Sequence, residues 1–153
     1  MADLEGSETR EIDAPIERVF AIAADIDRAP EWQGVMKSVD VLERDADGRA
    51  SLVDVELDSG VVKNAIRMRF TYDEPAGLRW TRESGDLKSL VGSWEFAELG
   101  DGRTRATYSL EIGLNRALSL LRRTIRGPAE ARIRSLLVER PVDGLKERAE
   151  KGG

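Results

Sequence analysis

The chain has 153 residues, of which 41% are hydrophobic and 35% charged, and its net charge is −5 at neutral pH. It contains no cysteine and no histidine, which excludes disulfides, zinc–thiolate sites and the commonest general base. The acidic balance argues against nucleic acid as the main partner, and no residue pattern predicts a metal site or a cofactor. We find no bilayer-spanning apolar run and no signal peptide. We therefore expect a cytoplasmic protein with a single domain over residues 1–153, in which 1–6 and 151–153 are flexible.

The N-terminal part predicts a strand followed by two short helices. Residues 7–12 form the strand, and Asp13 is a candidate N-cap with Pro15 in the first helical turn. Asp25 is the candidate cap of a second helix that ends near Trp32. Asp25 and Asp27 are therefore interpreted as capping residues.

Six further runs alternate apolar with polar residues, which is typical of strands with one buried face. Turn sequences rich in Asp, Gly and Pro separate them at 45–48, 58–60, 74–77, 84–86 and 100–102. The acidic residues Asp54, Glu56 and Asp58 alternate with apolar ones and are predicted to face outward.

The C-terminal stretch predicts a long helix, because apolar residues recur at helical spacing from 114 to 149. Gly127-Pro128 interrupts the pattern, and a helix from 128 to 148 would span about 30 Å. Pro141 is expected to kink this helix, because it cannot donate to the Leu137 carbonyl. The sequence thus predicts an α+β fold, in which a curved antiparallel sheet of about seven strands wraps round one long, kinked helix.

The same stretch is rich in arginine. Between residues 115 and 140 the sequence has seven arginines but only two glutamates. Arg116, Arg122, Arg123 and Arg126 are candidates for contact with an anionic membrane or an acidic protein, and a solvated helix face is the alternative interpretation. The sequence does not predict whether residues 114–127 lie on the sheet or project from it.

Several segments resemble a known superfamily. Residues 12–20, I-D-A-P-I-E-R-V-F, resemble the I-x-A-P-x-E-x-V-F/W start of START-like (SRPBCC) proteins, and residues 25–32 resemble their D-x-x-x-Y-P-x-W segment. Further similarity at 39–43, 47–49, 92–94, 102–105 and 145–148 points to the polyketide cyclase/dehydrase and coenzyme Q-binding branch. The chain departs from the pattern at Ala29, where an aromatic is expected, and in the length of segment 114–127. The resemblance implies a helix-grip fold whose cavity, between sheet and helix, binds a hydrophobic molecule.

The strand alternation supplies candidate ligand contacts. The inward-facing candidates are Trp32, Val55, Leu57, Asn64, Ile66, Met68, Phe70, Trp80, Trp94, Phe96, Tyr108, Leu110, Ile133 and Leu137. Plain core packing is the alternative for each of them. Tyr72, Arg82 and Tyr108 are the candidate catalytic residues, although a tyrosine of ordinary pKa is a poor base at neutral pH. Because Asn64 and Arg82 lie near strand ends, water is the expected partner for their side chains.

Three functions are compatible with the sequence. The favoured one is binding or carrying a hydrophobic small molecule, such as a lipid, an isoprenoid quinone or a polyketide. The first alternative is an aromatic polyketide cyclase/dehydratase, and the second is an interaction module that uses the arginine-rich face. Binding is favoured because of the alternating apolar strand face and the family resemblance. The sequence has no nucleophile elbow, phosphate loop or metal-ligand spacing.

Overall fold

The computed structural model describes residues 4–58, 60, 63–116, 119–120, 131–132 and 134–151. The elements are β1 (Leu4–Ile12), α1 (Ile16–Ala24), the 3-10 helix η1 (Ile26–Glu31), β2 (Met36–Arg44), β3 (Ala50–Asp58), β4 (Lys63–Asp73), β5 (Gly77–Gly85), β6 (Ser89–Gly100), β7 (Arg103–Gly113), the π-helix η2 (Ser135–Glu139) and α4 (Arg140–Lys151).

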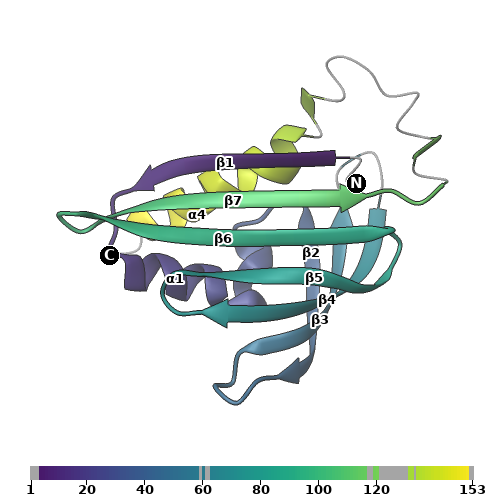
Figure 1. Cartoon of the computed structure of the whole chain (residues 1–153), viewed down its shortest axis with the longest axis horizontal. Coiled ribbons are helices and arrows are strands. Elements are labelled where there is room, and N and C mark those ends of the chain that lie inside the picture. The colour runs from purple at the N-terminus through teal and green to yellow at the C-terminus, as the bar shows by residue number, and fades with distance from the viewer. Residues whose placement is uncertain are drawn as a thin grey trace.

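The strands form one antiparallel sheet in the order β1-β7-β6-β5-β4-β3-β2. Strands β2 to β7 follow one another through short turns, whereas β1 lies beside β7 at the far edge (Figure 1). The predicted α+β class and the seven strands are confirmed.

The sheet has one apolar and one charged face. On β4 the side chains of Ile66, Met68 and Phe70 are buried, while the residues between them are exposed. On the outer face, Arg67 Nε lies 2.8 Å from the Asp54 carboxylate, and Glu56 accepts a hydrogen bond from Ser38. The outward direction predicted for Asp54 and Glu56 is therefore confirmed.

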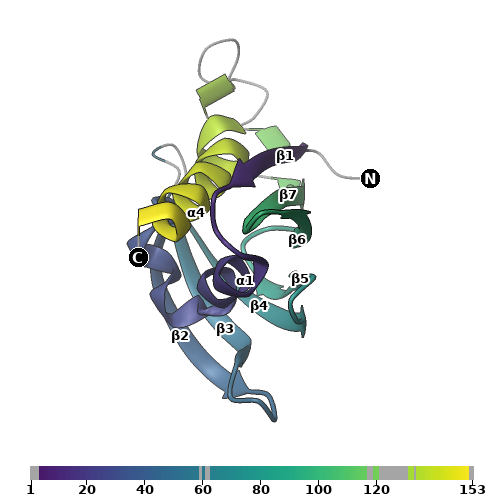
Figure 2. The ribbon, with the colours of Figure 1, turned by 90° about the vertical axis from the view of Figure 1, so that its left-hand side faces the viewer.

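The sheet bends into a trough around the helices. Figure 2, which looks along the trough, shows the strands curving round α4 and α1. Polar contacts fasten α4 along β1 and α1: Arg10 Nε lies 3.1 Å from Asp143, and Arg18 Nε donates to the Ala149 carbonyl at 2.8 Å. The predicted arrangement, a curved sheet wrapped round a C-terminal helix, is confirmed.

The helix cap predicted at Asp13 is wrong, whereas Asp25 occupies the predicted N-cap position of η1. Helix α1 begins at Ile16 with Pro15 in the N-cap position and without a side-chain cap, and the Pro15 carbonyl accepts the N–H groups of Arg18 and Val19. The backbone N–H of Asp13 instead donates to Glu150 Oε2 at 2.8 Å. The Asp25 carbonyl accepts the Arg28 N–H at 3.2 Å, although its side chain makes no capping bond. Asp27 is not a cap, because its carboxylate pairs with Arg44 at 3.1 Å.

Pro141, where a kink is predicted, follows a π-helical turn. It lies in the first turn of α4, directly after η2. There the N–H of Arg140 donates to the Ser135 carbonyl, which gives the helix one wide turn before the proline. The expected break at Gly127-Pro128 and most of segment 114–127 lie outside the described residues. No helix in the described part of the chain is long and apolar enough to cross a membrane.

Candidate functional site

Aromatic side chains form the floor of the trough. The ring centroids of Phe70 and Trp80 lie 5.7 Å apart, as do those of Trp80 and Tyr108. Trp94 lies 4.7 Å from Tyr108 and 5.9 Å from Phe96, so the rings are continuous from β4 to β7. Such contacts favour a rigid and strongly apolar surface.

The structure brings most of the predicted ligand contacts together on this concave side. The buried ones are Val55, Ile66, Met68, Phe70, Trp80, Trp94, Phe96, Tyr108 and Leu110, and the partly exposed ones are Trp32, Leu57, Asn64 and Leu137. Ile133 lies outside the described residues. Their role in binding stays a prediction.

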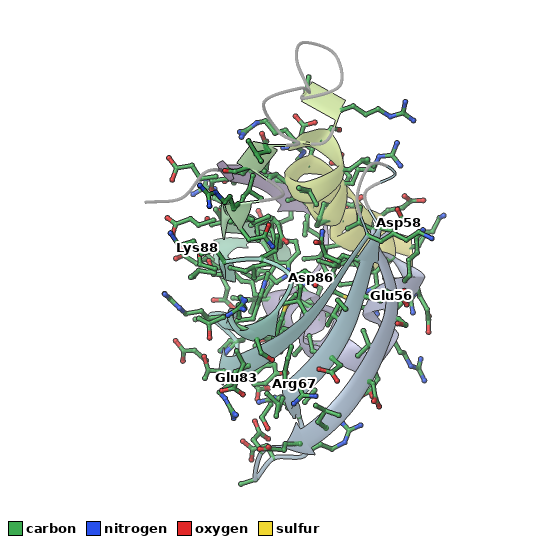
Figure 3. All side chains as sticks on the ribbon, turned by 90° about the vertical axis from the view of Figure 1, so that its right-hand side faces the viewer. Glu56, Asp58, Arg67, Glu83, Asp86 and Lys88 are labelled. Carbon is green, nitrogen blue, oxygen red and sulfur yellow. The ribbon has the colours of Figure 1, made fainter. Side chains whose placement is uncertain are left out.

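At one end of the trough several described side chains are only partly buried. Inward-facing residues there keep part of their surface accessible: Leu57, Asn64, Arg82, Leu114 and Leu137. Figure 3 looks at this end, where Asp58 ends β3 and where Asp86 and Lys88 lie in the β5–β6 turn. We call it the open end.

The β5–β6 turn is anchored on both sides. Asp86 Oδ2 accepts a hydrogen bond from the Ala65 N–H at 2.8 Å, and the Lys88 N–H donates to the Gly113 carbonyl at 2.9 Å. Between them Leu87 is only 5% exposed and packs into the core. The turn therefore forms a fixed rim for the open end.

Arg82 carries an unpaired donor just inside this rim. The paired ladder between β5 and β6 ends at Thr81–Val91, and Arg82 Nη2 donates to the Gly85 carbonyl at 2.9 Å. In the described part of the chain, Arg82 Nε is the only fully enclosed side-chain nitrogen or oxygen without a partner. The expectation that water meets this group is therefore wrong for Nε, because the protein shields it. An unmet buried donor typically costs about 1–3 kcal/mol.

The two candidate tyrosines differ in their surroundings. Burial raises the pKa of the Tyr108 phenol above its ordinary value, and this phenol makes no hydrogen bond to a described residue. Burial, followed by the nearby charge of Asp45, also raises the pKa of Tyr72. The Tyr72 phenol, however, donates to the Ala50 carbonyl at 2.5 Å. Neither tyrosine can act as a base at neutral pH, and only the Tyr108 phenol lacks a partner among the described residues.

The predicted catalytic residues therefore do not converge as a group of three. Tyr72 pairs with Leu78 on β5, whereas Arg82 pairs with Met68. This offset of four residues along the strand corresponds to about 13 Å. Arg82 and Tyr108 remain as two unmet polar groups on an otherwise apolar concave face.

Sequence reasoning placed Gly92 on a strand face with Leu90 and Trp94 but missed its close contact with Trp80. This glycine lies opposite Trp80 across β5 and β6, on the inward face between Leu90 and Trp94. A Cβ atom at Gly92 would collide with the Trp80 indole. The signal was available, because a glycine within a strand often marks a close approach by a neighbouring group.

A separate surface pocket of about 280 Å³ lies at the other end of the sheet, between α1 and the β2–β3 turn. Its lining includes Phe20 and Ala24 from α1 and Arg49 from the turn. The two guanidinium groups in the lining already pair with carboxylates, Arg44 with Asp27 and Arg49 with Glu74. The pocket thus offers a ligand few unmet polar groups.

The arginine-rich segment is only partly described. Arg116 is exposed, and Arg122, Arg123 and Arg126 lie outside the described residues. Within the described ranges, no cluster of Asp and Glu could hold a metal ion.

Comparison with known proteins gives one family and many similar folds. The family model for polyketide cyclase/dehydrase and lipid transport proteins matches residues 12–139. A START superfamily protein from Mycobacterium smegmatis is 20% identical with a TM-score of 0.79, covering 96% of this chain and 97% of its own. A protein from Thermus thermophilus is 23% identical with a TM-score of 0.78, and the match covers 95% of this chain and 97% of that protein. The Zhui aromatase/cyclase from a Streptomyces species is 21% identical with a TM-score of 0.72, and the match covers 97% of this chain and 94% of the aromatase/cyclase. No curated protein sequence matches the chain.

Proposed function

The chain belongs to the family of polyketide cyclase/dehydrase and lipid transport proteins, and from this premise we propose that it binds a hydrophobic small molecule between the sheet and the C-terminal helix. The ligand enters at the open end and rests on the aromatic floor. Burial of its apolar surface supplies most of the binding free energy.

The enclosed Nε of Arg82 carries this proposal. A plain structural core would gain stability by pairing or removing such a donor, because an unmet polar group in an apolar interior is costly. Reorientation of the Arg82 side chain, part of which is accessible, would present this donor to a carbonyl or carboxylate oxygen of a ligand. The ligand is thus an apolar molecule with an oxygen acceptor near one end, held at Arg82 by a charge-assisted hydrogen bond.

A titration with 1-anilinonaphthalene-8-sulfonate, an apolar probe with an anionic group, tests the proposal. We expect saturable binding to the wild-type protein and a roughly tenfold to hundredfold weaker affinity for Arg82→Gln, the range set by a charged hydrogen bond. Arg79→Gln is the matched control, because Arg79 is exposed on the opposite face of the same strand. An absence of binding, or equal losses in the two variants, would refute the proposal. Mass spectrometry of solvent extracts of the purified protein would identify a natural ligand.

A second candidate function is cyclisation of a polyketone, which the free donor of Tyr108 on the same concave face favours. In an aldol ring closure a new carbon–carbon bond forms, the α-proton leaves to water, and the new alkoxide takes up a proton. The Tyr108 phenol can protonate this alkoxide, and the resulting phenolate then takes up a proton from water. The test is turnover of a poly-β-ketone: Tyr108→Phe should lower kcat strongly, and unchanged kcat would exclude this role.

A further inference from the structure

The sheet has two outer strands, β1 and β2, and these two edges differ in regularity. The register between β2 and β3 shifts at three places between Met36 and Arg44. Such irregularities hinder the pairing of an edge with a further strand. Strand β1 instead pairs with β7 without a shift over all nine residues from Leu4 to Ile12. It is thus the edge to which another strand could be added most easily.

Cations from the C-terminal helical segment, residues 134–151, bind carbonyl groups on the β1 edge. Arg134 Nη1 donates to the Glu5 carbonyl at 2.9 Å, and Lys146 Nζ donates to the Glu11 carbonyl at 2.8 Å. Glu5 and Glu11 are an even number of residues apart, so their main-chain groups point to the same side of the strand. This is the side away from β7, where an added strand would place its own N–H donors.

Two more main-chain groups are held in a similar way. Arg10 Nη1 donates to the Thr9 carbonyl at 2.9 Å, and Arg10 Nε donates to the Asp143 carboxylate at 3.1 Å. Just beyond the strand, the Asp13 N–H donates to Glu150 Oε2 at 2.8 Å. Side chains of one helical segment therefore reach four main-chain groups along the edge, three of them directly and one through Arg10.

The lengths of the helical segment and the strand match, so these contacts are spread along the whole edge. From Arg134 to Glu150 the helix advances by about 24 Å, and from Glu5 to Asp13 the chain advances by about 27 Å. Helix α4 runs beside β1 (Figures 1 and 2). A Cβ at Gly6 would lie only 2.7 Å from Arg134 Nη1, so this glycine leaves room for the guanidinium at the first contact.

We infer that the C-terminal helical segment guards the β1 edge, because its side chains keep β1 from pairing with β1 of a second copy of this chain. A second copy presents the same regular edge, and two antiparallel copies of β1 could otherwise join their sheets through main-chain hydrogen bonds. An approaching strand must first displace Arg134 and Lys146 from their acceptors, which leaves two charged donors unmet. No ligand takes part, so the guarded edge is independent of the proposed function.

Analytical ultracentrifugation of Arg134→Ala/Lys146→Ala over a range of concentrations tests the inference. The matched control is Arg140→Ala/Lys151→Ala, which removes the same two charges from the same segment. Arg140 is exposed and Lys151 pairs with Glu147, and neither bonds to a described residue of β1. We expect the dissociation constant for self-association to be about tenfold or more lower in the first variant than in the control. Hydrogen exchange at low and high concentration should then show added protection in β1 and in no other strand.

Association of Arg134→Ala/Lys146→Ala with protection of β1 supports the guarded edge. Equal association of the two double variants, or association that leaves β1 unprotected, refutes it. A wild-type protein that already pairs through β1 refutes it as well. Where circular dichroism shows that Arg134→Ala/Lys146→Ala does not fold, Lys146→Ala alone should give a smaller shift in the same direction, with Lys151→Ala as its control. No shift in Lys146→Ala then overturns the inference.

Discussion

The α-carbon of Gly144 on α4 lies against the backbone carbonyl oxygen of Trp32, the residue that follows η1. A Cβ at position 144 would collide with this oxygen, which belongs to the backbone and cannot rotate away. The close approach sets the depth at which α4 enters the trough, because it fixes one side of the helix while the contacts to β1 fix the other. We therefore expect Gly144→Ala to push α4 outward.

The expected loss of unfolding free energy for Gly144→Ala is about 1–3 kcal/mol, the usual cost of overpacking. This loss opposes the gain of about 1 kcal/mol that alanine normally brings to a helix interior. Urea unfolding followed by circular dichroism measures it. Gly34→Ala is the control, because a Cβ there meets no atom within 4 Å. Equal stability of the two variants would show that α4 is not seated by this contact.

Thr104 gives a prediction about the junction between β1 and α1. It is fully buried, and its hydroxyl donates to the Ala14 carbonyl at 2.8 Å. Thr104→Val keeps the shape but removes the donor, which should lower the unfolding free energy by about 1–3 kcal/mol. Thr107→Val, whose hydroxyl meets Thr9 on the accessible outer face, should change it by less than about 0.5 kcal/mol. Thermal or urea unfolding distinguishes them, and a neutral Thr104→Val would contradict the assigned bond.

The strand pattern was predictable because it depends on neighbours in sequence. Apolar and polar residues alternate along β4, and turns rich in acidic residues and glycine separate the strands. This pattern specifies which face of each strand is buried, and that sheet face must then be covered by other elements. The absence of a cap at Asp13 could not be predicted in this way. Asp13 is bonded by Glu150, 137 residues away, and no local signal reveals such a partner. The wide turn before Pro141 was likewise hidden, because a proline alone does not specify how the helix adjusts.

The candidate site was predictable to the level of strand faces. Alternation placed Arg82 and Tyr108 on the inward side, where the structure has them. It also placed Tyr72 there, but the phenol of Tyr72 turns to the Ala50 carbonyl at the strand edge. The enclosure of Arg82 Nε depends on how β5 and β6 separate after Thr81–Val91, which is a property of the folded sheet and not of local sequence.

The contrast between the two tyrosines can be measured. Tyr72→Phe removes a hydrogen bond to a backbone carbonyl, so the unfolding free energy should fall by about 1 kcal/mol. Tyr108→Phe removes a hydroxyl with no partner among the described residues, so stability should be unchanged or rise by up to about 1 kcal/mol. Urea unfolding of both variants without ligand tests this. A large loss in Tyr108→Phe would mean that its hydroxyl has a structural role.

Glu150 ties the end of α4 to the start of the fold and makes stability depend on pH. Its carboxylate accepts from Lys146 Nζ at 2.7 Å and from the Asp13 N–H at 2.8 Å, and these bonds lower its pKa below the ordinary value of 4.5. A carboxyl whose pKa is lower in the folded state stabilises the fold above its unfolded pKa, and this contribution disappears as the pH falls through the folded value. Stability should therefore decline in acid partly through Glu150.

Glu150→Gln tests this linkage. At pH 7 the unfolding free energy should fall by less than about 1 kcal/mol, since the carboxylate is partly exposed and screened. Between about pH 5 and pH 3 the variant should lose less stability than the wild type, because it no longer binds the proton that the wild-type carboxylate takes up on unfolding. Lys146→Gln removes one of the two donors and should give an intermediate slope. Urea unfolding at several pH values measures the slopes, and parallel curves for the wild type and Glu150→Gln would rule out this source of acid sensitivity.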